Sequence, residues 1–186
     1  DAVAENNIFS CDQINSYKPT WHYNSSKGVM IYDNGPIVNS PGTGFGGADE
    51  STVQENLGFS TLGSGFQLSG TTRNRVADDF SVNATSWDID SVVFFGYQTG
   101  STLTSTFTAV NLRIWDGVPN APGSNVVWGD TIANVLDTAY FSGVYRVLSS
   151  NAGTDDTDRP IMRLVCKTTG LSLAGGNYWF DYQAEG

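Results

Sequence analysis

The chain has 186 residues and a formal net charge of −10, with 19 acidic side chains against nine Lys and Arg. This length suits one domain with a substantial core, and an aromatic content of 12% excludes a disordered chain. So few cations argue against nucleic-acid binding, which depends on Lys and Arg that neutralise phosphates, and no apolar run approaches the roughly 20 residues of a membrane helix.

Residues 1–28 are expected to form an N-terminal arm or an added strand, ahead of a single β-sandwich domain over residues 29–186. Within the arm, residues 1–15 include apolar side chains with no visible partner. Such a segment could be a strand donated to a neighbouring subunit, or a simple tether.

Only one segment of the domain has helical spacing. Ser51 and Gln54 stand in capping-box positions, and Val53 and Leu57 lie four residues apart, which predicts a short helix within Asp49 to Leu57. We therefore expect at most one short helix in the molecule.

The rest of the domain is predicted to consist of strands separated by turn residues. Strands are expected at residues 28–32, 59–68, 75–82, 87–97, 104–116, 126–128, 139–148, 160–167 and 177–182. The segment 87–97 is apolar on both faces, which is typical of a central strand. Strands at intervals of roughly 10 to 15 residues, with no helices between them, predict an all-β fold, an antiparallel β-sandwich of jelly-roll type.

Five short stretches carry a resemblance to a known kind of domain. They are YDNGP at 32–36, GGADES at 46–51, NRVADDF at 74–80, FGYQTG at 95–100 and LRIWDG at 112–117. In this order and spacing they resemble a β-sandwich domain of large secreted bacterial surface proteins, often from marine or environmental species. The resemblance covers about residues 32–182. It implies a secreted protein in which such domains sit beside adhesion or sorting modules, and it carries no activity with it.

Composition and cysteine usage also favour an extracellular protein. The chain is poor in Lys and rich in Ser, Thr, Asn and Gly, and its two cysteines, Cys11 and Cys166, could form one disulfide. The alternative is that Cys166 is a buried thiol, because it alternates with Met162 and Leu164 in an apolar run.

Catalysis is poorly supported by the residue types. A Ser-His-Asp arrangement would have to use His22, the single histidine, and the stretch 170–174 lacks the following helix of a nucleophile elbow. A glycosidase needs two carboxylates across a cleft, but in a chain so rich in Asp these residues more simply cap turns. The sequence therefore predicts a protein that is not an enzyme.

Calcium is the best-supported cofactor, in a structural role. Asp- and Gly-rich turns supply carboxylate and carbonyl oxygens, the hard ligands that Ca²⁺ prefers. Three places qualify: Asp78 with Asp79, Asp116 with the Asn120 loop, and the run 155–158.

Asp78 lies on the apolar face of its predicted strand, with Val76, Phe80 and Val82. An unpaired carboxylate there would be costly. Three explanations remain open: it binds a cation, it pairs with a backbone group or an arginine such as Arg75 or Arg113, or a bulge turns it outward.

Aromatic side chains are the remaining functional signal. Exposed rings bind sugars by stacking on their apolar faces, while polar side chains bind the hydroxyls. The candidate ligand-binding residues are Trp128, Trp115, Tyr97, Tyr140 and Asp130. Trp128 follows a Pro/Gly loop and Trp115 ends a strand, so these two are the ones most expected at the surface. The alternative is that the rings simply fill the core.

Two functions compete on this evidence. The first is a secreted, non-catalytic recognition or adhesion module, whose partner is a polysaccharide or a cell-surface glycan. The second is a structural subunit of an extracellular fibre or matrix, in which copies of the chain exchange β-strands. No nucleic acid and no membrane insertion are expected in either case.

Overall fold

The computed structural model describes residues 29–59, 65–71 and 73–186. Its elements, in chain order, are the 3₁₀ turn η2 (Phe45–Gly47), β1 (Asp49–Val53), the 3₁₀ turn η3 (Glu55–Leu57), β2 (Val76–Gly96), β3 (Ala109–Trp115), β4 (Val126–Gly129), β5 (Leu136–Leu148), the 3₁₀ turn η4 (Ser149–Asn151) and β6 (Pro160–Glu185). The predicted all-β class is confirmed. No helix in the described part of the chain is long and apolar enough to span a membrane.

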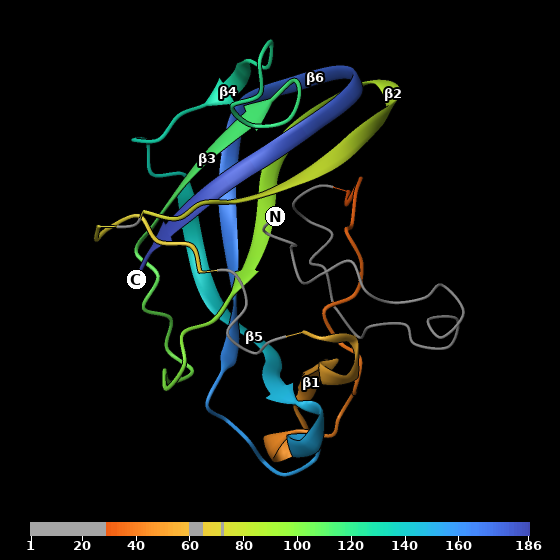
Figure 1. Cartoon of the computed structure of the whole chain (residues 1–186), viewed down its shortest axis with the longest axis vertical. Coiled ribbons are helices and arrows are strands. Elements are labelled where there is room, and N and C mark those ends of the chain that lie inside the picture. The colour runs from red at the N-terminus through yellow and green to blue at the C-terminus, as the bar shows by residue number, and fades with distance from the viewer. Residues whose placement is uncertain (1–28, 60–64, 72) are drawn as a thin grey trace.

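The six strands form one mixed sheet built around β6 (Figure 1). One edge of β6 pairs with β2 along nearly its whole length. Its other edge pairs first with β5 and then, further along the strand, with β3, which in turn pairs with β4. All these ladders are antiparallel, but β1 pairs with β5 in parallel, so the expectation of a purely antiparallel arrangement is wrong at this edge.

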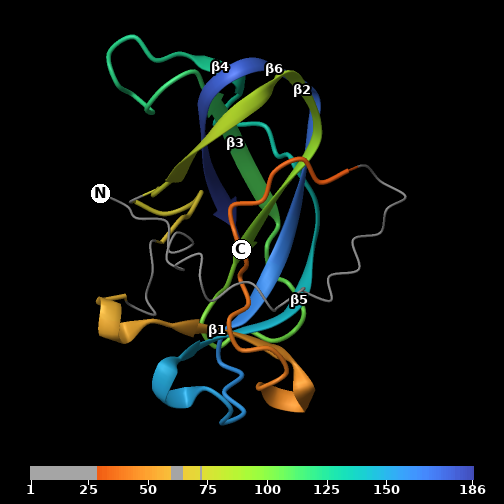
Figure 2. The ribbon, with the colours of Figure 1, turned by 90° about the vertical axis from the view of Figure 1, so that its right-hand side faces the viewer.

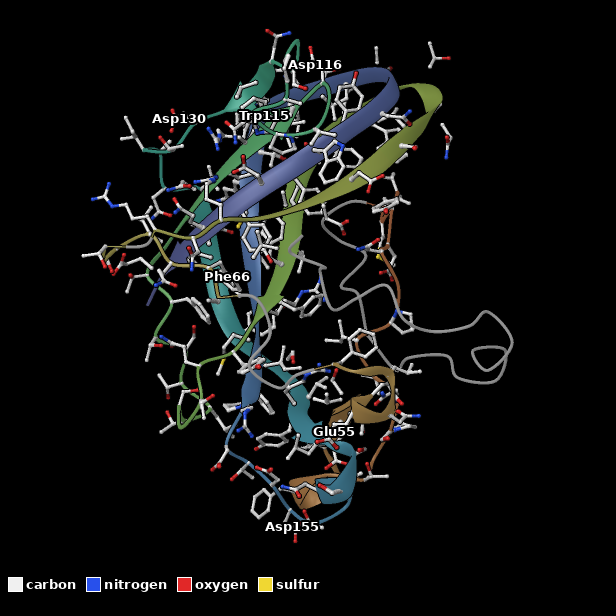
Figure 3. The ribbon with its side chains drawn as sticks, viewed as in Figure 1. Glu55, Phe66, Trp115, Asp116, Asp130 and Asp155 are labelled. Carbon is white, nitrogen blue, oxygen red and sulfur yellow. The ribbon has the colours of Figure 1, made fainter. Side chains whose placement is uncertain are left out.

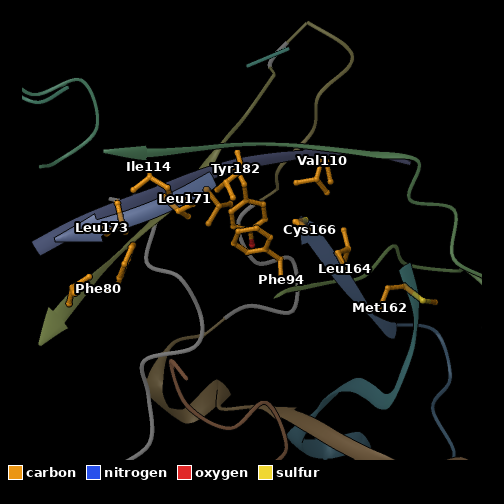
Figure 4. Packing of buried hydrophobic residues seen from close by; sticks show 14 residues of the cluster. Phe80, Phe94, Val110, Ile114, Met162, Leu164, Cys166, Leu171, Leu173 and Tyr182 are labelled. Atoms are coloured by element: carbon orange, nitrogen blue, oxygen red, sulfur yellow. The ribbon is translucent and has the colours of Figure 1, made fainter. Parts of the chain in front are cut away.

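The β2–β6 ribbon folds back on itself, so that two halves of the same sheet enclose the core. Phe94 lies opposite Leu164 at one end of the ribbon, and Tyr182 lies opposite Val76 at the other. A straight strand would separate Leu164 from Tyr182 by roughly 60 Å, yet the rings of Phe94 and Tyr182 stack 3.8 Å apart (Figure 4). Figures 1 and 2 show the ribbon turning over at the end near β4, with β1 at the opposite end.

Residues facing the inside of this fold alternate within three stretches of β6, and the parity changes where the β2–β6 register shifts. The buried members are Met162, Leu164, Cys166, Leu171, Leu173, Tyr182 and Ala184. They pack against the core-facing residues of β2 and β3, including Phe94, Val110, Leu112 and Ile114. Apolar alternation in the sequence thus correctly marks the core face of β6 and β3.

Four predicted strands are joined in pairs into two long ones. The predictions 75–82 and 87–97 both lie in β2, and 160–167 and 177–182 both lie in β6. The register shifts between Val82 and Ser86, where the ribbon bends. A Cβ at Gly175 would lie 2.7 Å from the carbonyl oxygen of Ala84. Glycine therefore allows the close backbone approach, and what reads as a turn in the sequence is an irregularity within a continuous ladder.

The predicted helix at Asp49 to Leu57 is wrong. Residues Asp49–Val53 form β1, and only Glu55–Leu57 adopt a 3₁₀ turn. This segment is a strand because it pairs with β5, which buries Thr52 and Val53. Such tertiary packing overrides weak local propensity.

Three further predictions differ from the observed strands. The described residues of the predicted strands 28–32 and 59–68 lie outside any ladder, and residues 28 and 60–64 are not among those described. The predicted strand 104–116 begins only at Ala109. Hydroxyl groups before it bond locally instead, as Ser105 Oγ does with the N–H of Phe107 at 3.2 Å, which competes with strand pairing. The expected N-terminal arm, residues 1–28, also lies outside the described residues.

Candidate functional site

Asp116 uses its carboxylate to close the loop between β3 and β4. It accepts hydrogen bonds from the backbone N–H of Asn125 at 2.6 Å and from the Asn125 side-chain amide at 3.1 Å. These bonds hold the pKa of Asp116 below its ordinary value. Asn120, in the same loop, has a positive φ of 62°. The arrangement is that of a capped turn.

Asp78 remains on the core-facing side of β2, opposite Phe180, with no bulge at its position. Its carboxylate accepts a hydrogen bond from the Asn34 side-chain amide at 2.6 Å and another from the N–H of Asp79 at 3.0 Å. Burial raises its pKa. Of the three explanations, the bulge is therefore wrong and a backbone partner is present. Asn34 was not anticipated, although the 32–36 stretch containing it had been singled out.

The third acidic turn is also closed locally. Asp156 accepts hydrogen bonds from the Asn151 amide and from the N–H of Asp158, both at 3.0 Å, and these bonds lower its pKa. Asp79, the remaining predicted metal ligand, is exposed and lies opposite Trp179 on the other face of the ribbon from Asp78. Among the residues that the structure describes, no three acidic, histidine or cysteine side chains converge on one point.

The strongest charge cluster centres on Asp181, which sequence reasoning did not single out. Its carboxylate pairs with Arg75 through Nε and with Arg113 through Nη2, the latter at 2.7 Å. It also accepts a hydrogen bond from the indole N–H of Trp115 at 2.7 Å. The side chain of Asp181 is only 3% exposed. Both arginines proposed as partners of Asp78 therefore bind a different carboxylate.

Alternation places this cluster on the outer face of the sheet half formed by β2, β3 and β6. Arg113 lies opposite Asp181, and Asn111 lies opposite Gln183. Arg75 donates to the side-chain oxygens of both Asn111 and Gln183, the latter at 2.7 Å. The signal was present in the sequence, because Asp181 and Gln183 alternate with apolar residues of the last strand. Asn111 and Gln183 also donate to the backbone carbonyls of Thr131, Gln67 and Arg73. The cluster is thus paired within the protein and joins β3 and β6 to the residue preceding β2.

Trp115 and Trp128 both make packing contacts within the protein. Trp115 is buried, with the Arg113 guanidinium 4.8 Å from the centre of its ring. Trp128 is half-buried and packs against the main core. Trp115 is therefore not the exposed ring that the sequence predicts, whereas Trp128 keeps part of its surface exposed.

Asp130 closes the turn that follows β4. Its carboxylate accepts hydrogen bonds from the backbone N–H groups of Ile132 and Ala133, at 2.7 and 2.6 Å, and these lower its pKa. Figure 3 shows Asp130, Asp116 and Trp115 toward the same end of the molecule, with Glu55 and Asp155 at the opposite end.

The remaining two predicted ligand residues lie on the outer face of the other half of the sheet. Tyr140 of β5 is 47% exposed and pairs directly with Arg163 of β6, which in turn pairs with Phe95 of β2. The Arg163 guanidinium lies 5.9 Å from the centre of the Phe95 ring. Tyr97, half-buried, lies two residues after Phe95 and just beyond the end of β2. We call Tyr140, Arg163, Phe95 and Tyr97 the Tyr140 face.

Arg163 is the polar residue that makes this face distinctive, and it was missed. Its Nε atom is buried and has no hydrogen-bond partner among the described residues. The sequence contained the signal, because Met162 and Leu164 point into the core and so direct Arg163 outward. An exposed aromatic ring beside a guanidinium fork can stack on a sugar and donate hydrogen bonds to its oxygens.

Of the two cysteines and the histidine considered in the sequence analysis, the structure describes only Cys166. Cys166 is a free thiol, fully buried in the core, and burial raises its pKa to about 12. Its expected partner Cys11 and the single histidine, His22, lie outside the described residues.

Comparison of the chain with protein-family models, with curated proteins and with solved structures finds no match. The resemblance to secreted bacterial surface domains therefore stays a prediction. The candidate site rests on the geometry of the Tyr140 face.

Proposed function

We propose that the protein is a secreted, non-catalytic recognition or adhesion module, and that it binds carbohydrate at the Tyr140 face. The observation that carries the proposal is the pairing of an exposed Tyr140 with Arg163 in the β5–β6 ladder, between two irregularities of its register. A sheet face holds its side chains in fixed positions, so an aromatic platform and a hydrogen-bond donor there are ordered before the sugar arrives. The jelly-roll sandwich belongs to this proposal, and the facing halves of the folded sheet support it.

The proposal is tested by affinity gel electrophoresis of the full chain in gels that contain soluble plant, algal or bacterial polysaccharides. We expect at least one polysaccharide to retard the wild-type chain, and Tyr140→Ala to lose most of the retardation. Phe45→Ala is the matched control, because Phe45 is also an exposed aromatic residue, at 56%, but lies in η2, outside the strands that carry the Tyr140 face. Migration unaffected by every polysaccharide, or equal retardation of Tyr140→Ala, contradicts the proposal.

A second function, assembly into a fibre or matrix, is favoured by β2. This strand is 21 residues long and pairs only with β6 among the described elements, so one of its edges has no strand partner there. It contains no Lys, the residue that most often protects exposed edges. The proposed occupant is residues 1–15 of a neighbouring copy. Light scattering tests this: polymers that disappear when residues 1–15 are deleted support it, and a wild-type monomer of 20.0 kDa contradicts it.

A further inference from the structure

Arg163 forms no ion pair with any residue that the structure describes, although the protein is strongly acidic. The chain has 19 carboxylate side chains for nine Lys and Arg, so a partner would be easy to provide. Arg75 and Arg113 share Asp181, and Lys167 pairs with Asp137 at 2.5 Å. In the described part of the structure, no such pair includes Arg163. Its guanidinium lies over the Phe95 ring.

In the described part of the structure, Arg163 also has a buried hydrogen-bond donor without an acceptor. Among the described residues, the buried Nε of Arg163 has no hydrogen-bond partner, and neither has the buried hydroxyl of Ser142, which lies two residues after Tyr140 at an irregularity of the β5–β6 register. Buried polar atoms in native proteins are nearly always paired with protein, water or a ligand. A buried charged donor left unpaired is costlier than a neutral one. An unpaired charged donor on the residue that pairs with the exposed Tyr140 indicates that this face can receive an oxygen-rich group.

We propose that the Tyr140 face binds an acidic polysaccharide, with the carboxylate of a hexuronic acid unit paired to Arg163 and the sugar ring stacked on Tyr140. This inference rests on the proposed carbohydrate-binding function and names its substrate class. A guanidinium presents parallel N–H donors that match the two oxygens of a carboxylate. A neutral sugar would leave that charge uncompensated, so the pairing supplies selectivity as well as affinity.

The test measures binding of the full chain to three uronate polysaccharides, polygalacturonate, alginate and hyaluronan, and to neutral xylan and soluble cellulose, by isothermal titration calorimetry. Fully methyl-esterified polygalacturonate is the matched ligand control, since it keeps the sugar backbone and loses the charge. We expect a uronate to bind at least tenfold more tightly than any neutral polymer, because hydrogen bonds to charged groups contribute more than neutral ones. If polygalacturonate is that ligand, esterification should remove the advantage.

Variants separate the specific contact from general electrostatics. Arg163→Gln should weaken uronate binding about tenfold or more and leave the melting temperature within a few degrees of wild type. Arg163→Lys keeps the charge but loses the planar guanidinium with its parallel donors. Its affinity for the uronate should therefore lie between those of wild type and Arg163→Gln. Lys167→Gln removes the same charge from the same strand, where Asp137 already neutralises it, and should bind as wild type does. Equal weakening by Lys167→Gln and Arg163→Gln overturns the inference.

The two proposals fail in distinguishable ways. If neutral polysaccharides bind at Tyr140 as tightly as uronates do, the acidic-ligand inference is wrong and the carbohydrate-binding function stands. If no polysaccharide of either class binds, both are wrong.

Discussion

Asp181 is compensated from three directions, by Arg75, Arg113 and the indole N–H of Trp115. These contacts join the end of β6 to β3 and to the residue preceding β2. A carboxylate buried in this way is not available to bind a ligand. Its value to the protein is structural, and removing its charge would leave two partly buried guanidinium groups without a counterion.

We therefore expect Asp181→Asn to lower the free energy of unfolding by about 3 kcal/mol, the lower end for breaking a buried pair, since both arginines retain some exposure. Asp137→Asn breaks the exposed pair with Lys167 and should cost less than about 1 kcal/mol. Urea unfolding of both variants checks this. Similar decreases in the free energy of unfolding for the two variants would show that the Asp181 cluster stabilises the fold no more than a surface ion pair does.

Asp78 makes the stability depend on pH in the opposite sense from a salt-bridged carboxylate. Burial raises its pKa in the folded state, so the folded protein binds this proton more tightly than the unfolded chain, where the pKa is about 3.9. The contribution to stability is present below the unfolded pKa and is lost as pH rises through the folded pKa.

The corresponding variant is Asp78→Asn, which cannot ionise. We expect the stability of wild type relative to Asp78→Asn to fall as pH rises from 3 to 7, measured by urea unfolding at each pH. Asp88→Asn, at an exposed position of the same strand, serves as the control for general charge effects. A relative stability that increases over this range would contradict the burial of the Asp78 charge.

At the scale of the elements, the β3–β4 ladder depends on Gly129. This residue has a φ of 76°, and a Cβ placed on it would lie 2.1 Å from the carbonyl oxygen of Leu112. Gly123, in the preceding loop, has a φ of 90° but no atom within 4 Å of its added Cβ.

Alanine variants of the two glycines therefore distinguish the cost of backbone strain alone from the added cost of a steric clash. Gly123→Ala should cost about 1–2 kcal/mol, the penalty of a left-handed conformation, and Gly129→Ala should cost clearly more because β4 must also move away from β3. Thermal unfolding of both variants measures the difference. Equal melting temperatures would mean that β4 shifts freely to accommodate the methyl group.

Strands with one apolar face could be predicted from the sequence. Segments whose conformation depends on pairing with a distant strand could not. Alternation identified the core face of β3 and β6, because burial follows a period of two in any strand. It missed that Gly175 lies inside a ladder, since a glycine at a bend has the same local sequence signal as a glycine in a turn. Helical spacing misassigned Asp49–Val53, whose conformation is fixed by a parallel partner almost 100 residues away.

At the scale of the whole molecule, the candidate site is a product of strand pairing. Tyr140 was identified from its residue type, but its neighbours Arg163 and Phe95 come from strands far apart in the sequence. Register cannot be read from one strand alone, so their proximity was not predictable. Trp115 was wrongly expected at the surface for the same reason, because the fold of the sheet buries it, while Trp128 is only partly buried against the core.

The most direct test of the account is an amide NMR titration of the ¹⁵N-labelled full chain with oligosaccharides of the polysaccharide that retards it most strongly. We expect chemical-shift changes centred on Tyr140, Arg163 and Phe95, with little change around the Asp181 cluster. Changes centred instead on Trp128 and Asp130, or no change with any oligosaccharide, would contradict carbohydrate recognition at the Tyr140 face.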